Sequence, residues 1–328
     1  MARCEVCFRH CEIKDGGIGF CGARTCEGGK VVALNYGLAT GLALDPIEKK
    51  PLNRFHPESF ILSFGSFGCN LRCPFCQNHD ISWSEAAMSM SEVVRVKLYS
   101  QAESTTLTKA DTGYNNTGYV NTAYAEAYSE LKQFGLQYIS PETLAATAEK
   151  YKDHGNIGVA FTYNEPLVGY EYIRDAAKLI KEKGMFNVLV TNGTAELNIL
   201  EEIIPYIDAM NIDLKGFTDR YYRDVLGGDR QMVMNFIARA VKSCHVELTT
   251  LIIPGENDSE DEMHELTDWI AGLSDADGNI IGKNIPLHIS RFFPRFKMTD
   301  RDATDIAHIY HLAEIARENL TWVYTGNC

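Results

Sequence analysis

The chain has 328 residues, of which 45% are hydrophobic and 23% are charged, and its formal net charge is −13. This charge argues against binding to nucleic acid, because phosphates require a positive surface. The sequence contains no run of about eighteen apolar residues, so it predicts no membrane span. The amino terminus lacks the apolar segment of a secretory signal, so the ten cysteines predict metal binding in a reducing, cytoplasmic compartment rather than disulfides. The length suits one large α/β domain with a small appendage.

The first segment of the chain is rich in cysteine. Its four candidate metal ligands are Cys4, Cys7, Cys11 and Cys21. Glycines between the last two allow tight turns, and because so short a segment cannot build a hydrophobic core, a bound metal would supply its folding free energy. We predict structural zinc, with a second iron–sulfur cluster and metal-free thiols as the alternatives. Cys26 or His10 could replace one ligand.

A short strand is predicted at residues 31–34, after the cysteines. Residues 45–52 contain two prolines and two adjacent lysines, which are typical of a linker lying across the main domain. The chain is therefore expected to divide into a cysteine-rich module at 1–45 and a main domain at 46–328.

The next predicted strand, at residues 60–64, is followed by three cysteines with C-x-x-x-C-x-x-C spacing, namely Cys69, Cys73 and Cys76. Thiolates are the ligands of iron–sulfur clusters, and four of them normally complete a [4Fe–4S] cluster. Three thiolates leave one iron with an open position for chemistry. The alternatives are a zinc site, which usually requires four ligands, and buried cysteines without metal.

This spacing resembles the signature of radical S-adenosylmethionine (SAM) enzymes. The resemblance implies a [4Fe–4S] cluster whose open iron is chelated by the amino and carboxylate groups of SAM. It also implies that Phe75, the aromatic residue before the last cysteine of the motif, lies near the adenine.

Residues 85–137 interrupt the regular pattern and form a predicted insertion in the main domain. Tyrosines recur along it, at Tyr99, Tyr114, Tyr119, Tyr124 and Tyr128. The last two, with Leu131, share one face of a predicted helix that Gly135 ends. So long a connection is usually functional or disordered. We weigh a lid or partner-docking flap over the cluster against a surface decoration without a chemical role.

From residue 140 onward, predicted strands alternate with predicted helices. The strands are expected at 157–161, 186–190, 209–213, 246–253, 285–289 and 322–324, and the helices at 140–154, 170–183, 197–206, near 221 and 232, 259–273 and 302–319. This alternation is typical of βαβ units and a parallel sheet. Because no Gly-x-Gly-x-x-Gly motif follows a strand, it favours a partial (β/α)6 TIM-like barrel over a Rossmann sheet.

Polar residues follow the predicted strands, where barrel enzymes carry their reactive groups. Glu165 can accept hydrogen bonds from the amino group of SAM. With Pro166 it resembles the Gly-Gly-Glu-Pro motif of radical SAM enzymes, although Tyr163 and Asn164 replace the glycines. The alternative role of Glu165 is to cap a helix. Asn192 suits ribose hydroxyls or a carboxylate, but Asn-Gly is also an ordinary turn.

Asp213 and Lys215 follow the next strand and would point to the same side in extended backbone. Lys215 could neutralise the carboxylate of SAM and Asp213 could bind its ammonium group, whereas the alternative is a surface ion pair. His288, on a later strand, is a candidate for lining the ribose or the substrate, although a lone histidine is more often structural. Arg291 is a weaker candidate.

The motifs at 69–76, 165–166, 191–193 and 213–215 occur in the order found in pyruvate formate-lyase activating enzymes, which abstract hydrogen from a glycine of a partner protein. The cysteine-rich module and residues 69–82, 162–166 and 287–294 resemble more closely the AmmeMemoRadiSam radical SAM proteins, whose name reflects genomic association with AMMECR-type and Memo-type proteins. Two differences matter. Activating enzymes commonly carry an acid where this chain has Val190, so the resemblance does not extend to the cation site that they build beside the carboxylate of SAM. The insertion at 85–137 suggests a different substrate or partner.

We therefore predict a radical SAM oxidoreductase whose reduced cluster cleaves SAM to methionine and a 5′-deoxyadenosyl radical in an anaerobic, water-excluding site. The radical abstracts hydrogen from a substrate. The resemblance implies a glycyl-radical activase, and the alternative is a small-molecule enzyme working with AMMECR-type or Memo-type proteins. A non-catalytic iron–sulfur carrier or scaffold is the alternative of another class. The expected partner is an external one-electron reductant of the flavodoxin or ferredoxin type.

Overall fold

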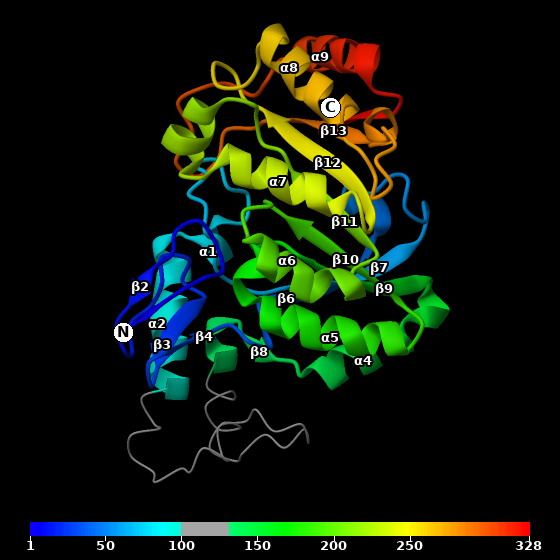
Figure 1. The fold of residues 1–328 in the computed structure, drawn as a ribbon. Coiled ribbons are helices and arrows are strands. Elements are labelled where there is room, and N and C mark those ends of the chain that lie inside the picture. Colours follow the sequence, from blue (N-terminus) through cyan, green and yellow to red (C-terminus); the bar gives the residue numbers. More distant parts are fainter. Residues whose placement is uncertain (100–130) are drawn as a thin grey trace.

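One sheet of eight strands forms the centre of this computed structural model, which describes residues 1–99 and 131–328 (Figure 1). Its strands are β6 (Gly41–Pro46), β7 (Phe60–Gly65), β9 (Asn156–Thr162), β10 (Phe186–Thr191), β11 (Ala209–Asp213), β12 (His245–Ile252), β13 (Leu287–Arg291) and β14 (Val323–Gly326). They lie in the order β14-β13-β12-β11-β10-β9-β7-β6, and neighbours from β7 to β14 are parallel, while β6 is antiparallel to β7. The predicted α/β fold with a parallel sheet is confirmed.

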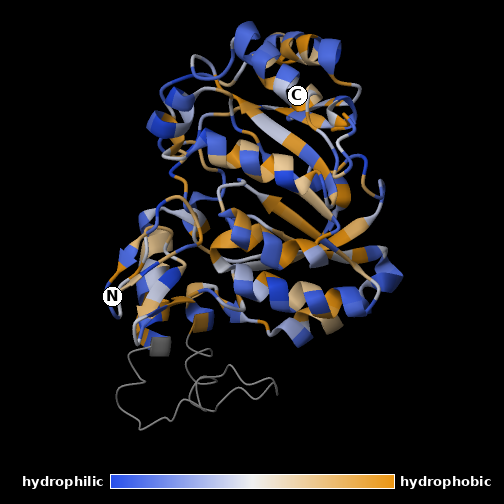
Figure 2. Ribbon diagram, viewed as in Figure 1, coloured by the Kyte–Doolittle hydropathy of each residue, from blue (hydrophilic) through white to orange (hydrophobic). Residues whose placement is uncertain are grey.

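Helices connect the parallel strands and pack beside one another along the sheet (Figure 1). They are α4 (Pro141–Lys150), α5 (Tyr170–Glu182), α6 (Leu197–Ile203), α7 (Arg230–Ala240), α8 (Glu260–Ala271) and α9 (Ile306–Asn319), with a π-helical turn at Tyr221–Leu226. Figure 2 shows hydrophobic and hydrophilic residues alternating along α5 and α7, as helices with one buried face require. Across the residues that the structure describes, no helix is both long and apolar enough to cross a membrane.

Capping residues set the helix boundaries. The hydroxyl of Ser140 accepts a hydrogen bond from the N–H of Thr143 at 3.2 Å, so α4 begins where the sequence predicts. The last helix begins at Ile306 rather than at residue 302, because the carboxylate of Asp305 accepts a hydrogen bond from the N–H of Ala307 at 2.9 Å.

The predicted linker at 45–52 is wrong in its first residues. Asp45 pairs with Ile61 and Pro46 with Phe60, so this stretch completes β6 and crosses the predicted boundary between residues 45 and 46. Proline is tolerated there because β6 is an edge strand and Pro46 is its last residue. The rest of the stretch packs onto the main domain, with Leu52 fully buried.

The cysteine-rich module consists of short hairpins. β1 (Ala2–Arg3) pairs with β2 (Glu12–Ile13), and β3 (Arg24–Glu27) pairs with β4 (Lys30–Ala33), which corresponds to the strand predicted at 31–34. β5 (Leu38–Ala39) pairs with β8 (Gln137–Tyr138), so the end of the predicted insertion is attached to the module.

The described part of the insertion packs against the module. After the short α1 (His79–Ser82), α2 (Glu85–Tyr99) buries Val94 in a hydrophobic cluster with Leu34, Phe67 and Leu136. Residues 85–99 therefore form part of a second small core. The segment 100–130, which carries Tyr114, Tyr119, Tyr124 and Tyr128, lies outside the described residues, and the lid or docking flap stays a prediction.

The module also packs on the loop that follows β7. The N–H of Cys69 donates a hydrogen bond to the carbonyl of Cys21 at 3.0 Å. The preceding residue, Gly68, has a φ of +94°, and a Cβ atom there would lie 2.8 Å from the same carbonyl oxygen and 2.7 Å from the Cβ of Ala23. Only glycine permits both this conformation and this close approach.

A buried carboxylate anchors the segment after β6. Glu247 on β12 accepts hydrogen bonds from the backbone N–H groups of Asn53 (3.0 Å) and Arg54 (2.7 Å), and the Nε2 atoms of His245 and His288 lie 2.9 and 2.7 Å from its oxygens. Burial raises the pKa of Glu247, but the hydrogen bonds, led by that of His245, outweigh it and lower the pKa to about 2. The side chain is therefore ionised at neutral pH.

Because the folded pKa of Glu247, about 2, lies below the unfolded value of about 4.3, this group stabilises the fold above pH ~4.3 and the stabilisation is lost as the pH falls toward about 2. We expect Glu247→Gln to lower the free energy of unfolding by ~3 kcal/mol at neutral pH. Chemical denaturation at several pH values measures the difference, which should shrink below pH ~4.3. The exposed Glu265→Gln is the control, and a difference independent of pH would contradict the assignment.

The contact at Gly68 predicts a second effect on stability. Gly29 also has a positive φ, +76°, but nothing lies within 4 Å of a Cβ atom placed there. Gly29→Ala should therefore lower the free energy of unfolding only by the backbone strain, about 1 kcal/mol. Gly68→Ala should lower it by at least about twice as much, because the loop of Gly68 must separate from the loop of Cys21 and Ala23. Thermal and chemical unfolding compare the two variants, and equal losses would show that the close approach is unimportant.

Candidate functional site

Three cysteines share the loop between β7 and α1, at the carboxyl end of the parallel strands, where barrel enzymes place their active sites. The N–H of Leu71 donates to the sulfur of Cys69 at 3.5 Å, and the N–H of Cys76 donates to the carbonyl of Cys73 at 3.2 Å. One of these bonds holds the sulfur of Cys69, and the other holds a backbone turn between Cys73 and Cys76. This is the position that the sequence predicts for Cys69, Cys73 and Cys76.

The three thiols strongly resist ionisation. Burial raises the pKa of Cys73 to about 12, although Lys215 lowers it. Burial also raises the pKa of Cys69, and the neighbouring Glu165 and Cys73 raise it further. The pKa of Cys76 is raised by burial as well. A cationic metal centre would supply the positive charge that thiolates need here.

Tyr163 and Asn164 stand where the Gly-Gly-Glu-Pro motif has two glycines. Tyr163 has a φ of +75°, a conformation that glycine adopts without strain and tyrosine does not. Its hydroxyl donates to Asp45 at 2.8 Å. The side-chain amide of Asn164 donates to the carbonyls of Phe67 and Gly68, both at 3.1 Å. Tyr163 therefore ties the end of β9 to β6, and Asn164 ties it to the loop that carries the three cysteines.

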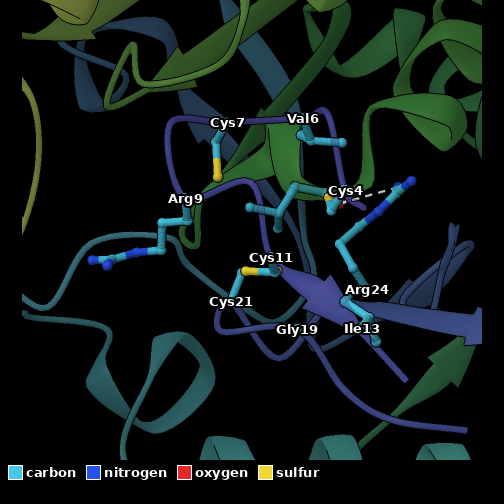
Figure 3. A pocket seen from close by; sticks show the side chains of 10 residues that line it. Cys4, Val6, Cys7, Arg9, Cys11, Ile13, Gly19, Cys21 and Arg24 are labelled. Atoms are coloured by element: carbon cyan, nitrogen blue, oxygen red, sulfur yellow. Dashed lines mark hydrogen bonds between the residues drawn. The ribbon is translucent and has the colours of Figure 1, made fainter. Parts of the chain in front are cut away.

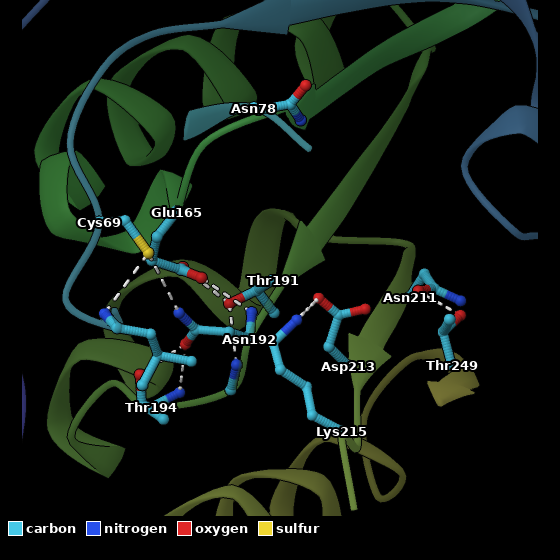
Figure 4. Close-up of polar contacts among 12 residues, drawn as sticks. Cys69, Asn78, Glu165, Thr191, Asn192, Thr194, Asn211, Asp213, Lys215 and Thr249 are labelled. Atoms are coloured by element: carbon cyan, nitrogen blue, oxygen red, sulfur yellow. Dashed lines mark hydrogen bonds and ion pairs between the residues drawn. The ribbon is translucent and has the colours of Figure 1, made fainter. Parts of the chain in front are cut away.

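Glu165 lies at the junction of three elements (Figure 4). Its Oε1 accepts hydrogen bonds from the N–H of Leu167 at 3.0 Å and the hydroxyl of Thr191 at 2.8 Å, and its Oε2 accepts from the N–H of Asn192 at 2.8 Å. Burial raises the pKa of Glu165 to about 7 even though these donors lower it. A carboxylate has about four acceptor positions, so three donors leave room for one more, such as an ammonium group.

Glu165 also has the alternative role that the sequence suggested. It caps the 3₁₀ turn at Pro166–Gly169 through its bond to the N–H of Leu167. The backbone N–H of Glu165 donates to the carbonyl of Gly68 at 3.2 Å. Capping and ligand binding are compatible, because the capping bond uses only one acceptor position of the carboxylate.

Asn192 is engaged by the protein through both ends of its amide. Its Nδ2 donates to Asn70 Oδ1 at 3.0 Å and lies 3.8 Å from the sulfur of Cys69, while its Oδ1 accepts from the N–H and the hydroxyl of Thr194 at 3.0 and 2.5 Å. These contacts orient the loop that carries Cys69, Cys73 and Cys76. The contact with ribose that we expected for Asn192 stays a prediction.

Asp213 and Lys215 form an ion pair at the end of β11, with 2.7 Å between Lys215 Nζ and Asp213 Oδ2 (Figure 4). The side chain of Lys215 is only 18% exposed, so the pair is not the surface pair of the alternative interpretation. Burial lowers the pKa of Lys215, but Asp213 and Cys73 outweigh it and raise the pKa. The ammonium group therefore stays charged beside the cysteine loop.

Each of the remaining candidates contacts another part of the protein. Phe75 is buried, with its ring in edge contact with Phe292. His288 faces Glu247 and stacks on Tyr324 with ring centroids 5.2 Å apart, and its role at the ribose or substrate stays a prediction. Arg291 donates to the carbonyl of Thr304 at 2.6 Å.

The four amino-terminal cysteines line one pocket, together with Arg9 and Arg24 (Figure 3). The two substitutes considered from the sequence do not line it. Cys26 instead donates to Asp15, with 3.7 Å between sulfur and oxygen, and Nε2 of His10 lies 3.3 Å from Glu196. Within residues 1–99 and 131–328, no three His, Cys, Asp or Glu side chains are arranged to hold a single metal ion. Zinc at this pocket stays a prediction.

Asn70, Arg9 and Arg72 also contact or belong to the cysteine loop, although the sequence did not single them out. Asn70 links Asn192 to the cysteine-rich module, and Arg9 donates to the carbonyl of Asn70 at 2.8 Å. Arg72 donates to the carbonyl of Cys69 at 2.8 Å. Each lies within a cysteine motif, and this position is the only signal in the sequence that could have identified them.

Comparison with known proteins identifies relatives of the chain. An uncharacterized protein of Methanocaldococcus jannaschii is 33% identical over 327 residues, which cover 99% of this chain and 81% of that protein. Pyruvate formate-lyase 1-activating enzyme of Escherichia coli K12 is 24% identical over 123 residues, or 37% of this chain and 50% of the enzyme. Pyruvate formate-lyase-activating enzyme of Clostridium pasteurianum is 29% identical over 125 residues, which cover 38% of this chain and 52% of the enzyme.

Among solved structures, a domain of a pyruvate-formate lyase-activating enzyme from Bacteroides vulgatus aligns with a TM-score of 0.44 and 17% identity, covering 52% of this chain and 99% of that domain. The family model described as Radical SAM superfamily matches residues 64–267, which include the cysteine loop, Glu165 and the Asp213–Lys215 pair. The chain belongs to the radical SAM superfamily.

Proposed function

We propose that this chain is a radical SAM enzyme that binds a [4Fe–4S] cluster through Cys69, Cys73 and Cys76 and cleaves SAM at the iron that these ligands leave open. The cluster supplies the electron that breaks a carbon–sulfur bond of SAM, which yields methionine and a 5′-deoxyadenosyl radical. Membership of the superfamily implies both the cluster and SAM. The observation that carries the proposal is the gathering of Glu165 and the Asp213–Lys215 pair around the cysteine loop.

The residues around the loop fit a zwitterionic ligand. The buried carboxylate of Glu165 has one acceptor position left for the ammonium group of SAM. Lys215 carries a positive charge close to Cys73 and is suited to the carboxylate of SAM. Asp213 holds the ammonium group of Lys215 in place. In this arrangement Asn192 and Asn70 position the loop, and Phe75 offers an apolar surface for the adenine.

An iron–sulfur carrier without catalysis is a poorer explanation of these groups. An electron carrier needs no ligand besides the cluster. This site instead keeps the carboxylate of Glu165 buried, which costs free energy and raises its pKa to about 7. Such a cost is expected where a cation binds.

For the substrate, we propose hydrogen abstraction from a glycine of a partner protein, with an external flavodoxin-type or ferredoxin-type reductant. The named activating enzymes support this role, although their alignments cover only 37% and 38% of this chain. Because the relative that matches 99% of this chain is uncharacterized, a small-molecule substrate in an AmmeMemoRadiSam system, with AMMECR-type or Memo-type partners, is the second candidate. Deuterium transfer into 5′-deoxyadenosine from labelled candidate proteins and metabolites distinguishes the two.

The first test is SAM cleavage by the anaerobically reconstituted protein. With dithionite as reductant, the wild type should form 5′-deoxyadenosine and methionine in equal amounts, whereas Cys73→Ala should form neither because one iron ligand is lost. Cys244→Ser, which changes a cysteine outside both cysteine motifs, is the matched control and should cleave SAM like the wild type. An active Cys73→Ala variant would refute the ligand assignment.

A second test addresses the two charged contacts. Glu165→Gln and Lys215→Met should each weaken SAM binding to the reconstituted protein roughly ten- to hundredfold, because each removes a charge-assisted hydrogen bond worth ~1.5–3 kcal/mol. Equilibrium dialysis with labelled SAM gives the dissociation constants, and iron analysis verifies that the cluster is intact. Lys178→Met, at an exposed position of α5, controls for the loss of a lysine. Unchanged affinity in both site variants would remove these residues from the SAM site.

A further inference from the structure

We propose that Cys4, Cys7, Cys11 and Cys21 bind a second, redox-active [4Fe–4S] cluster from which an electron reaches the SAM-binding cluster. This inference rests on the proposed function for the assignment of Cys69, Cys73 and Cys76, but its first test does not require SAM cleavage. It replaces the structural zinc expected from the sequence with a metal centre that can change its oxidation state.

The pocket that these thiols line provides the donors that a four-iron cluster requires. The hairpin holds its cysteines through backbone bonds, with 2.9 Å from the N–H of Cys4 to the carbonyl of Cys11. The N–H of Ala23 donates to the sulfur of Cys21 at 3.4 Å. Such N–H bonds to sulfur tune the potential of iron–sulfur clusters.

The two cysteine groups are in direct contact through their backbones. The carbonyl of Cys21 accepts the hydrogen bond of 3.0 Å from the N–H of Cys69, so one bond joins a ligand residue of one site to a ligand residue of the other. Gly68 permits this contact, because any Cβ atom there would collide with Cys21 and Ala23. A structural zinc site that only stabilised its own hairpin would not need this approach.

A second connection runs through two asparagine side chains. Arg9 of the cysteine-rich module donates to the carbonyl of Asn70 at 2.8 Å, and the Oδ1 of Asn70 accepts from Asn192 Nδ2 at 3.0 Å. The same Nδ2 lies 3.8 Å from the sulfur of Cys69. The chain of contacts therefore leads from the cysteine-rich module, between Cys7 and Cys11, to the sulfur atom of Cys69.

Cationic side chains surround this junction. Arg9 and Arg72 lie against the ring of Phe20, with their guanidinium carbons 3.4 and 3.7 Å from its centroid. Arg24 is buried beside Cys4 and Cys21 and pairs with Glu171 at 2.6 Å. The positive charges favour the thiolates and stabilise the additional negative charge that each cluster acquires on reduction.

The electron balance is simple. A low-potential one-electron protein donor of the flavodoxin or ferredoxin class is oxidised as it reduces the amino-terminal cluster. That cluster is oxidised again when it passes the electron to the SAM-binding cluster, so one electron is consumed for each SAM cleaved. Zinc has no accessible second oxidation state and cannot take part in such a transfer.

Metal analysis of the full-length protein after anaerobic reconstitution is the first test. The preparations are the wild type, the Cys69→Ala/Cys73→Ala/Cys76→Ala variant, the Cys4→Ser/Cys11→Ser variant and the Cys244→Ser control. Two clusters predict about eight irons and about eight sulfides per chain in the wild type and in the control, and about four of each in either site variant. The triple variant should also give an electron paramagnetic resonance signal after reduction.

The wild type alone decides the question if a variant fails to fold. One zinc with about four irons per chain, or about four irons without zinc, would overturn the second cluster. A wild type with about eight irons that cannot cleave SAM would refute the proposed function while leaving the second cluster intact.

The transfer itself is tested by comparing reductants. SAM cleavage is measured once with a reduced flavodoxin-type protein and once with dithionite. We expect the ratio of the first rate to the second to fall several-fold in the Cys4→Ser/Cys11→Ser variant. The reason is that dithionite, a small reductant, can reach the remaining cluster directly. The control Cys244→Ser should keep the ratio of the wild type. An unchanged ratio in the site variant would overturn the transfer.

Discussion

The site depends on a carboxylate that the fold keeps out of water. Glu165 follows β9, accepts hydrogen bonds from Thr191 and Asn192 at the end of β10, and donates its own N–H to the loop after β7. Three neighbouring strand ends are thus joined at one residue. Burial makes the charged form costly, which the pKa of about 7 reflects, and the remaining acceptor position is suited to a cation. The position of the cysteine loop and the proposed orientation of SAM both follow from this constraint.

The chain departs from the Gly-Gly-Glu-Pro motif at Tyr163 and Asn164, and both residues make polar contacts at the end of β9. Tyr163 adopts the positive φ that glycine would supply, and its hydroxyl bonds to Asp45, whose carboxylate also pairs with the buried Lys50 at 2.8 Å. Asn164 uses its amide to bind the cluster loop. The strain of Tyr163 is thereby offset by polar contacts that glycine could not make.

Much of the fold could be predicted from the sequence because its signals are local. Apolar strands and the cap at Ser140 each involve neighbouring residues, and the order of polar residues after the strands placed Glu165 and the Asp213–Lys215 pair at the ends of β9 and β11. Predictions that depend on residues far apart in the chain were less successful. The edge strand β6 depends on pairing with β7, which the prolines in the predicted linker concealed.

The role of Asn192 depends on Asn70, which lies in a different loop, and the contact of His288 depends on Glu247 of the neighbouring strand. No spacing along the chain reveals such partners. The contact of Cys21 with Cys69 is of the same kind, because it joins two motifs that appear separate in the sequence.

The most direct measurement of the central claim is electron–nuclear double resonance on the reduced, reconstituted protein with SAM labelled with ¹⁵N in its amino group. If Cys69, Cys73 and Cys76 leave one iron open for SAM, the labelled nitrogen will show a hyperfine coupling to the cluster. A reduced cluster without this coupling, at a SAM concentration that saturates the protein, would contradict the account.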